Sequence, residues 1–177
     1  KNGDYVIDYK VKSKTNDNYT ISHKVDFSFN GNESVLFDNK KGARVYKGTS
    51  IEDARTWMGF AKNDFVAEVK IRDSEKVNFI TLSMLENLDM KAIFPKRIEI
   101  YGKSNDRWLP INQLEIDLQD HPDDRKSYFK EFTLAVNLEG YNEVKIVAVN
   151  HFKFPKAPVY DRKRKYSWIF VDEVIFW

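Results

Sequence analysis

The chain has 177 residues, with 29 lysines and arginines against 27 aspartates and glutamates, which gives a net charge of +2. A chain of this length can bury about 70% of the surface that its unfolded form exposes, so one domain, or one domain with an arm, can be stable without covalent staples. The near balance of charge gives no overall attraction to nucleic acid or to a membrane surface. The absence of cysteine excludes disulfides, thiolate metal sites and cysteine nucleophiles.

No run of the sequence reaches the length of a membrane span, for which about 18 apolar residues are needed. The chain starts with KNGDYVIDYK, which does not have the pattern of a signal peptide. Such a start is compatible with removal of a signal and with excision from a longer protein. Aromatic residues make up 15% of the chain, a content that suits thick β-sandwich cores and sugar-stacking surfaces equally.

Alternation of apolar and polar residues runs through most of the chain. Two weaker strands come first, at residues 5–12 and 24–29, and the segment 50–60 is at most a helical turn. Period-two alternation or β-branched apolar runs then predict six stronger strands, at residues 65–71, 76–85, 96–103, 127–136, 142–150 and 166–177. No segment has a sustained helical stripe of apolar residues.

Strands at this spacing, without helical crossovers, must pair antiparallel, and two stacked sheets are the usual way to bury many aromatic side chains. We therefore expect an all-β fold, an antiparallel two-sheet sandwich of the jelly-roll type. One connection, residues 151–167, is longer than the roughly 12–15 residues that loops in compact domains usually have. Long loops of this kind are usually functional or disordered, so residues 151–167 form a candidate site.

The closing run, YSWIFVDEVIFW (166–177), carries two adjacent acids in an apolar setting. Because neighbouring strand residues point to opposite faces, Asp172 and Glu173 are expected on different faces. Asp172 would share its face with Trp168, Phe170, Val174 and Phe176. Glu173 would share the other face with Ile169, Val171, Ile175 and Trp177. A buried carboxylate costs several kcal/mol unless it is paired, hydrogen-bonded or bound to a cation, so each acid needs a partner.

Several motifs, in this order, resemble those of discoidin-like domains, which are also called coagulation factor V/VIII type C-like or galactose-binding-like domains. They are SVLFDNKKG (34–42), TWMGF (56–60) followed by AKNDFVAEVKI (61–71), ENLDMKAIFPKRIEIYGKSNDRWLPI (86–111), NEVKIVAVN (142–150) and SWIFVDEVIFW (167–177). The turn at 104–108 departs from the family pattern, because Asn105, Asp106 and Arg107 stand where Asp-Gly is common.

Within this family, the Trp-x-Gly-Phe motif and the aromatic ending together resemble the C-terminal accessory domain of bacterial family 20 glycoside hydrolases, the β-hexosaminidase-like enzymes. The resemblance covers residues 34–177, which would form the sandwich domain, with residues 1–33 as an arm or extra strand of the same domain. It implies a non-catalytic carbohydrate-binding or accessory module of a secreted, periplasmic or cell-surface bacterial protein. The partners it implies are a glycan or an adjacent glycoside hydrolase catalytic domain.

The resemblance also implies one structural Ca²⁺ near an end of the sandwich. Carried over to this chain, the ligands would be Asp38, a carbonyl of Asn39 or Lys41, the Asp172 carbonyl and the Glu173 carboxylate, oxygen ligands of the kind that Ca²⁺ takes six to eight of. The alternative is that Glu173 pairs with Arg44, Lys41 or Arg55, and that Asp172 accepts hydrogen bonds from the N–H groups of a neighbouring loop.

Catalysis is not expected. Asp172 and Glu173 would be a poor acid and nucleophile pair, because retaining glycosidases hold two carboxyls about 5–5.5 Å apart across one cleft, whereas adjacent strand residues point apart. The three histidines, His23, His121 and His151, do not have metal-ligand spacing. The sequence also has neither a G-x-S-x-G motif nor a glycine loop that would cradle phosphate.

The long loop combines aromatic rings with long hydrogen-bond donors, which is the equipment for recognising a sugar. We expect a glycan to bind through the loops 86–95, 104–108 and 151–167. The residues expected to contact it are Phe154, Tyr160, Arg162 and Tyr166, with His151 and Trp108 as further candidates. Two alternatives stay open: the loop packs on a neighbouring catalytic domain, or Arg162–Lys165 grips a sulfated polyanion. Nucleic acid is not expected as a partner, because the basic run is short.

Overall fold

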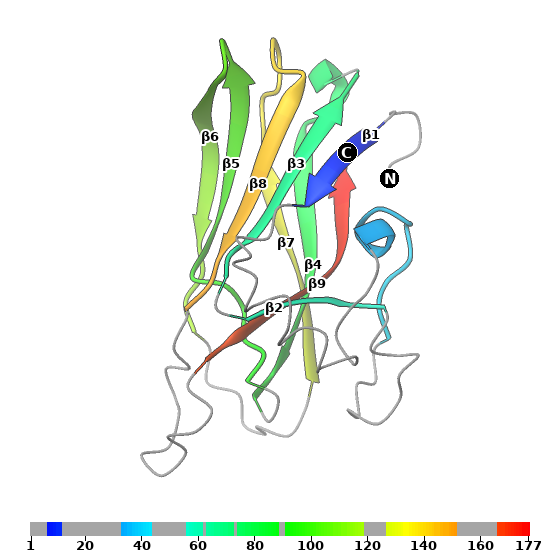
Figure 1. Cartoon of the computed structure of the whole chain (residues 1–177), viewed down its shortest axis with the longest axis vertical. Coiled ribbons are helices and arrows are strands. Elements are labelled where there is room, and N and C mark those ends of the chain that lie inside the picture. The colour runs from blue at the N-terminus through cyan, green and yellow to red at the C-terminus, as the bar shows by residue number, and fades with distance from the viewer. Residues whose placement is uncertain are drawn as a thin grey trace, which may run out of the picture.

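The computed structural model describes residues 7–11, 33–43, 56–61, 63–72, 74–88, 91–118, 127–151 and 166–177. These residues form two stacked antiparallel sheets (Figure 1). Two short 3₁₀ turns, η2 (Glu33–Leu36) and η3 (Ser74–Lys76), are the only helical elements with described bounds, and neither could cross a membrane. The predicted all-β, two-sheet antiparallel sandwich is confirmed.

The larger sheet has the strand order β1-β3-β8-β5-β6. Its strands are β1 (Ile7–Val11), β3 (Phe65–Ile71), β8 (Glu143–Val149), β5 (Arg97–Ser104) and β6 (Arg107–Glu115). In β3, β8 and β5 buried residues alternate with more exposed ones, so one face of this sheet lies on the core and the other faces outward. This alternation is the pattern from which the sequence predicted these strands.

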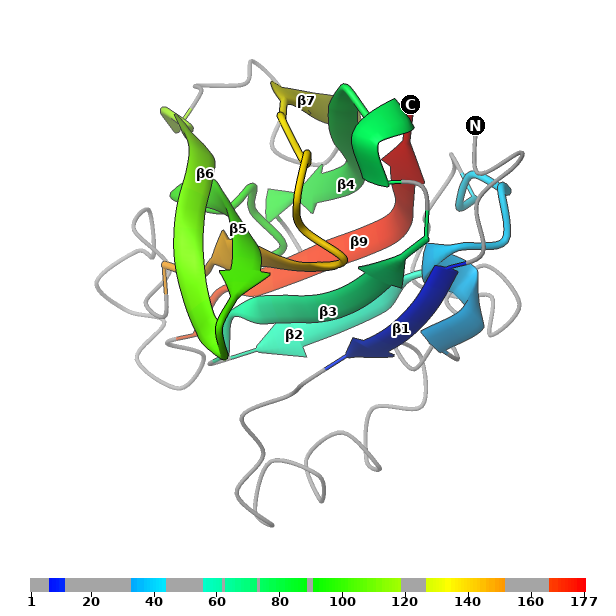
Figure 2. The same ribbon diagram turned by 90° about the horizontal axis from the view of Figure 1, so that it is seen from above.

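The smaller sheet has the strand order β2-β9-β4-β7. Its strands are β2 (Met58–Ala61), β9 (Trp168–Phe176), β4 (Phe79–Asn87) and β7 (Ser127–Ala135). Figure 2 shows β9 passing through the middle of the molecule, and its hydrogen-bonded neighbours are β2 and β4. Nearly every residue of β4 and β9 is buried, so both faces of the centre of this sheet are covered.

Two strands were missed by the sequence analysis. β6 is an edge strand that lies mostly exposed, so it has no apolar alternation, and it contains Pro110, which edge strands tolerate because they have free N–H positions. β2 is only four residues long and lies where a helical turn was the most that was expected. The predicted strand at residues 24–29 lies outside the described residues.

The main core lies between the two sheets and contains apolar residues from both, including Val69, Ile98, Ile146, Leu82 and Val171. Burying a side chain of this size contributes roughly 1.5–3 kcal/mol relative to leaving it exposed. A second, smaller cluster of Trp57, Leu85, Ala92 and Phe170, with Trp168 packed against it, lies apart from this core. Of the large aromatic side chains in the family-like motifs, Trp57, Phe60, Phe94 and Phe170 are buried, and Trp168 is partly buried.

Residues 38–43 reach this second cluster through Gly42. A Cβ atom added to Gly42 would lie 2.5 Å from Cε2 of the Trp57 indole, which is closer than side-chain atoms can approach. The backbone therefore passes directly over the ring because residue 42 has no side chain. This contact brings the segment that carries Asp38 and Lys41 onto the smaller sheet.

Candidate functional site

The two acids of β9 lie on the same face of the smaller sheet, because a β-bulge interrupts the strand. On β4, Ser83 pairs with Glu173 and the next residue, Met84, pairs with Val171, so Asp172 is the extra residue of β9. The core residues of β9 are Ile169, Val171, Val174 and Phe176. Both acids therefore point away from the core, and the predicted placement of Asp172 and Glu173 on opposite faces is wrong.

Asp172 is 1% exposed, and its Oδ2 atom accepts a hydrogen bond from the backbone N–H of Gly42. This is the capping of a loop N–H that sequence analysis proposed for Asp172. Its other oxygen, Oδ1, is buried and has no hydrogen-bond partner among the described residues. Burial raises the pKa of Asp172, and the nearby Ser83 hydroxyl and the Gly42 N–H offset part of that increase.

Glu173 is also 1% exposed, and within the described part of the chain neither of its carboxylate oxygens has a hydrogen-bond partner. Burial raises the pKa of Glu173 to about 8. The charges of Asp38 and Asp172 act in the same direction, while the backbone N–H groups of Asn39 and Lys40 lie near enough to favour the ionised form. Among the described residues, Glu173 thus has no positive partner for its buried carboxylate.

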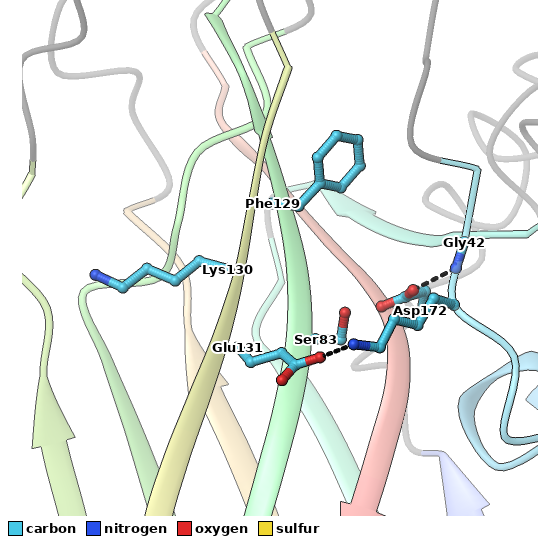
Figure 3. A pocket seen from close by; sticks show the side chains of 7 residues that line it. Gly42, Ser83, Phe129, Lys130, Glu131 and Asp172 are labelled. Carbon is cyan, nitrogen blue, oxygen red and sulfur yellow. Dashed lines mark hydrogen bonds and ion pairs between the residues drawn. The ribbon is translucent and has the colours of Figure 1, made fainter.

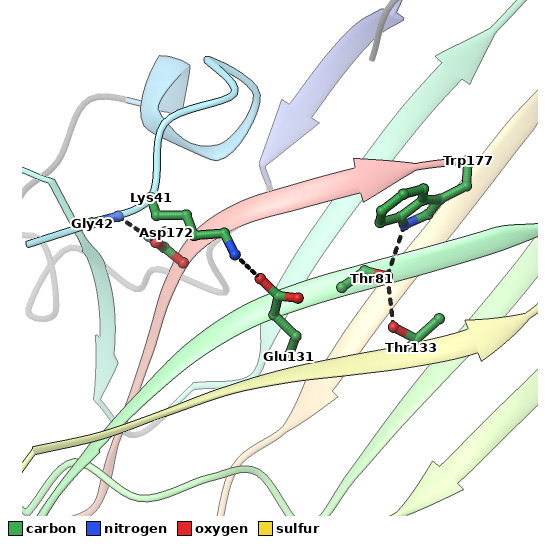
Figure 4. A network of polar contacts seen from close by, with 7 residues as sticks. All are labelled: Lys41, Gly42, Thr81, Glu131, Thr133, Asp172 and Trp177. Carbon is green, nitrogen blue, oxygen red and sulfur yellow. Dashed lines mark hydrogen bonds and ion pairs between the residues drawn. The ribbon is translucent and has the colours of Figure 1, made fainter. Parts of the chain in front are cut away.

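Lys41 does not pair with Glu173. Its ammonium pairs instead with Glu131 of β7, across the outer face of the smaller sheet (Figure 4). Both members of this pair are about half exposed. Arg44 and Arg55, the other partners proposed for Glu173, lie outside the described residues.

Two cavities open on this face. The first has a volume of about 320 Å³ and is lined by Lys41, Gly42, Ser83, Phe129, Lys130, Glu131 and Asp172 (Figure 3). The second has a volume of about 260 Å³ and is lined by Asn39, Lys41, Glu131, Glu173, Ile175 and Trp177. Lys41 and Glu131 line both, so their ion pair stands between the cavity of Asp172 and the cavity of Glu173.

Asp172 and Glu173 are poorly placed to act as a catalytic pair. Strand alternation predicted that the two acids point apart, but they lie on the same face. However, each lines a cavity of its own, whereas the two carboxyls of a glycosidase must flank the same glycosidic bond.

The groups near Glu173 offer oxygen atoms of the kind that Ca²⁺ takes, and they include a buried carboxylate for which the described residues supply no cation. Asp38 is exposed and close enough to raise the pKa of Glu173, and its Oδ1 accepts a 2.8 Å hydrogen bond from the Lys40 N–H. The described residues contain no group of three or more acidic or histidine side chains placed to hold a metal ion, so backbone carbonyls would have to complete the coordination.

Two of the predicted glycan-binding residues, His151 and Tyr166, lie just beyond the end of β8 and just before the start of β9, and these strand ends are at the lower end of the sandwich in Figure 1. The Ser167 hydroxyl donates to Asn150 Oδ1 at 2.7 Å, and Asn150 Nδ2 in turn bonds the Ser167 carbonyl. His151 and Tyr166 are the chain neighbours of this pair. Tyr166 is 46% exposed, whereas His151 is partly buried and has its pKa lowered by burial. Phe154, Tyr160 and Arg162 lie outside the described residues.

Trp108 lies at the opposite end of the sandwich. It pairs with Lys103 beside the β5–β6 turn, whereas His151 follows the end of β8 that pairs with Arg97, at the start of β5. Its ring is also covered, because the Lys145 ammonium lies 4.8 Å from the ring centroid. Trp108 and Tyr166 therefore cannot contact one small ligand.

Sequence analysis missed the residues that line the cavity of Asp172. Phe129, Glu131 and Ser83 were treated only as members of strands. Their outward direction follows from the alternation of β7 and β4, which the sequence does contain. The bulge in β9, which places Glu173 on the same face as Asp172, has no clear signal in the sequence.

No protein-family model matches the chain, and no curated protein matches it. Among solved structures, the K1 cleaved adhesin domain of Lys-gingipain from Porphyromonas gingivalis W83 has a TM-score of 0.47 and 9% sequence identity, and the match covers 99% of this chain and 98% of that chain. The family 32 CBM from C. perfringens NanJ, solved in complex with galactose, has a TM-score of 0.35 and 12% identity over 68% of this chain and 93% of that chain.

A third structure, CBM32-3 from a family 31 glycoside hydrolase of Clostridium perfringens, has a TM-score of 0.30 and 10% identity over 78% of this chain and 86% of that chain. Similarities of this size do not assign the chain to a family.

Proposed function

We propose that the chain is a non-catalytic carbohydrate-binding module of a secreted or surface-exposed bacterial protein that processes glycans. The observation that carries this proposal is the Asn150–Ser167 pair, which gathers the two ends of the aromatic and basic segment 151–167 at one end of the sandwich. The exposed ring of Tyr166 stands next to it. A rigid sandwich that presents a loop in this way is a common platform for recognition.

In this proposal Tyr166 supplies an apolar ring face for a sugar, and His151 stands beside it at the other end of the segment. Phe154, Tyr160 and Arg162 complete the contact from within the loop. The motif resemblance to discoidin-like domains supports this choice, because sugar binders of that family use loops at one end of the sandwich.

A glycan array combined with affinity gel electrophoresis tests the proposal. The wild-type protein is expected to be retained by at least one class of glycan, and Tyr166→Ala is expected to weaken that retention. Trp108→Ala is the matched control, since it also removes a large aromatic ring but at the far end of the sandwich. A protein that no glycan of any class retains would remove this function.

A second function is favoured by the exposed side chains of Phe79 and Trp177, which are 45% and 50% exposed. The backbone N–H of Trp177 donates to the Phe79 carbonyl, so these two exposed residues are neighbours. In this alternative the module braces a hexosaminidase-like catalytic domain. Replacing both residues by serine should then make the isolated module more soluble, with no change in glycan retention.

Sulfated polyanions are a third candidate ligand class, through Arg162–Lys165, which lie outside the described residues. Retention on heparin that disappears on adding salt would support it, because screening weakens contacts between exposed charges. Retention that is insensitive to salt would argue against it.

We also propose one structural Ca²⁺ at Glu173. The carboxylates of Glu173 and Asp38, the Asp172 carbonyl and a carbonyl of Asn39 or Lys41 would hold it. The support for this is the burial of Glu173 without a positive partner in the described part of the chain. A bound cation would supply the charge compensation that this carboxylate lacks.

A further inference from the structure

We propose a second glycan site on the outer face of the smaller sheet, in the cavity of Asp172. This inference rests on the proposed carbohydrate-binding function, and it names both a second place of contact and the kind of sugar that fits there. The cavity, at about 320 Å³, is at the lower end of the range for small-molecule sites, which is a suitable size for one sugar ring.

An aromatic ring forms one wall of the cavity. Phe129 is 36% exposed although it lies in a strand, and its ring centroid is 5.8 Å from that of the buried Trp57. Trp57 therefore supports Phe129 from behind and restricts its orientation. A fixed, half-exposed aromatic face is the kind of surface on which the apolar face of a pyranose ring stacks.

Polar groups lie along the other walls. Asp172 Oδ1 is buried without a hydrogen-bond partner, and the same carboxylate is held in place by the Gly42 N–H on its other oxygen (Figure 3). Ser83 lies beside it and pairs in register with Glu131, so its hydroxyl and the Glu131 carboxylate share this face. A ligand that donates a hydrogen bond to Oδ1 would remove the penalty of leaving that oxygen unpaired.

The charges at the cavity select a neutral ligand with many hydroxyl groups. A cationic ligand would meet the ammonium of Lys41, whose charge acts on Asp172, and an anionic ligand would meet Asp172 and Glu131. Hydroxyl groups satisfy both kinds of neighbour, because they can donate to the carboxylates and accept from Lys41. The chemical class assigned to the site is therefore a neutral sugar residue.

This site is separate from both sites proposed above. Glu173 lines the other cavity, beyond the Lys41–Glu131 ion pair, so a Ca²⁺ ion there would leave Asp172 Oδ1 available. Tyr166 lies beyond the Trp168 end of β9. A glycan could thus contact the module in two places.

The test is a two-dimensional amide NMR titration of the full chain with galactose, N-acetylgalactosamine, mannose and fucose as neutral probes, glucosamine as a cationic probe and glucuronate as an anionic probe. We expect at least one neutral probe to shift the amides of Gly42, Ser83, Phe129 and Asp172, and the two charged probes to shift them much less. Shifts of these amides with glucosamine or glucuronate alone would overturn the ligand class.

Two variants test whether the neutral probe binds at the cavity of Asp172. Phe129→Ala and the nearly isosteric Asp172→Asn are each expected to weaken binding of the neutral probe at this cavity roughly tenfold or more, as expected when a buried charged hydrogen bond or a stacking face is lost. Leu109→Ala, at a 42% exposed residue of β6 on the other sheet, is the control and should leave binding unchanged. The spectrum of each variant reports whether it is folded.

The outcomes separate this inference from the proposed function. Shifts confined to the neighbourhood of His151 and Tyr166 would overturn the second site and leave the carbohydrate-binding function standing. Shifts confined to the cavity of Asp172 would support the second site and remove the loop as the place of binding. The absence of shifts with every probe would overturn both.

Discussion

Gly42 donates its backbone N–H to the carboxylate of Asp172, a residue 130 positions away in the chain. The two residues meet because the chain passes over the Trp57 indole at Gly42 and because Asp172 lies on the outer face of the smaller sheet. This one hydrogen bond joins the early loop to the central strand of the smaller sheet. Both proposed sites on that sheet depend on it.

Gly42→Ala should destabilise the fold by about 1–3 kcal/mol, the usual range for an overpacked site, because the new methyl group would overlap the Trp57 ring. Urea unfolding would measure the change. Trp57→Phe shortens the ring and should rescue part of the loss. The double variant should therefore lose less unfolding free energy than the two single variants lose together. Strict additivity would mean that Gly42 acts through something other than this contact.

The stability of the wild-type protein without added metal should fall as the pH rises from about 4.5 to about 8. Glu173 has a pKa of about 8 when folded and an ordinary value near 4.5 when unfolded, so in this window the folded state holds a proton that the unfolded state releases. Glu173→Gln cannot ionise and should remove this part of the dependence of unfolding free energy on pH.

Urea unfolding at pH 5 and pH 8 in EDTA would test this prediction, with Glu131→Gln, at an exposed residue, as the control. Parallel pH profiles for Glu173→Gln and wild type would contradict the prediction.

Calcium should stabilise the wild-type protein, and more at pH 8 than at pH 5, because a ligand must be deprotonated to bind metal. At a hundredfold excess over Kd the gain would be about 2.7 kcal/mol. Thermal unfolding with calcium and with EDTA measures it. Glu173→Gln should abolish the difference, and Phe129→Ala should keep it. An equal calcium effect in wild type and Glu173→Gln would exclude Glu173 as a ligand.

Asn150 is expected to tolerate no acidic substitution. Its Nδ2 atom bonds the carbonyls of Phe60 at 3.1 Å and Asn63 at 3.0 Å, and the residue is fully buried. Asn150→Asp would place a carboxylate oxygen against those carbonyls, and we expect a loss of about 3–5 kcal/mol, the range for an uncompensated buried charge.

Chemical denaturation of Asn150→Asp and Asn112→Asp would test this together. The control residue, Asn112, also donates to a carbonyl, that of Ala135, but it is exposed, so water can replace the bond. Its aspartate variant should lose less than about 1 kcal/mol. A similar loss at both positions would show that burial is not what makes Asn150 sensitive.

The sequence predicted the strands whose inner and outer residues differ in burial. Residues 65–71 form β3 as predicted, and the predicted run 142–150 contains β8. β6 escaped notice because an edge strand with both faces near solvent needs no alternation. Pattern reasoning therefore found the strands that build the core and missed a strand that borders it.

The candidate site was harder to predict. Proximity of Glu173 to the Asp38 turn was expected from the motif resemblance, and the two groups do lie close enough to interact. The bulge reverses the face of every residue of β9 that follows it, and strict period-two reasoning cannot detect one extra residue. For that reason Asp172 and Glu173 were placed on opposite faces of the strand, and the cavity of Asp172 was overlooked.

The position of β9 has a consequence for how the protein is made. β9 joins β2 to β4, yet it is synthesised after both. While the ribosome is still translating the earlier residues, the smaller sheet lacks its central member, and the hydrogen-bonding edges of β2 and β4 that face it stay open. Folding of this layer must therefore wait for residues 168–176 to emerge, which leaves the nascent chain exposed to aggregation and gives chaperones a defined period in which to act.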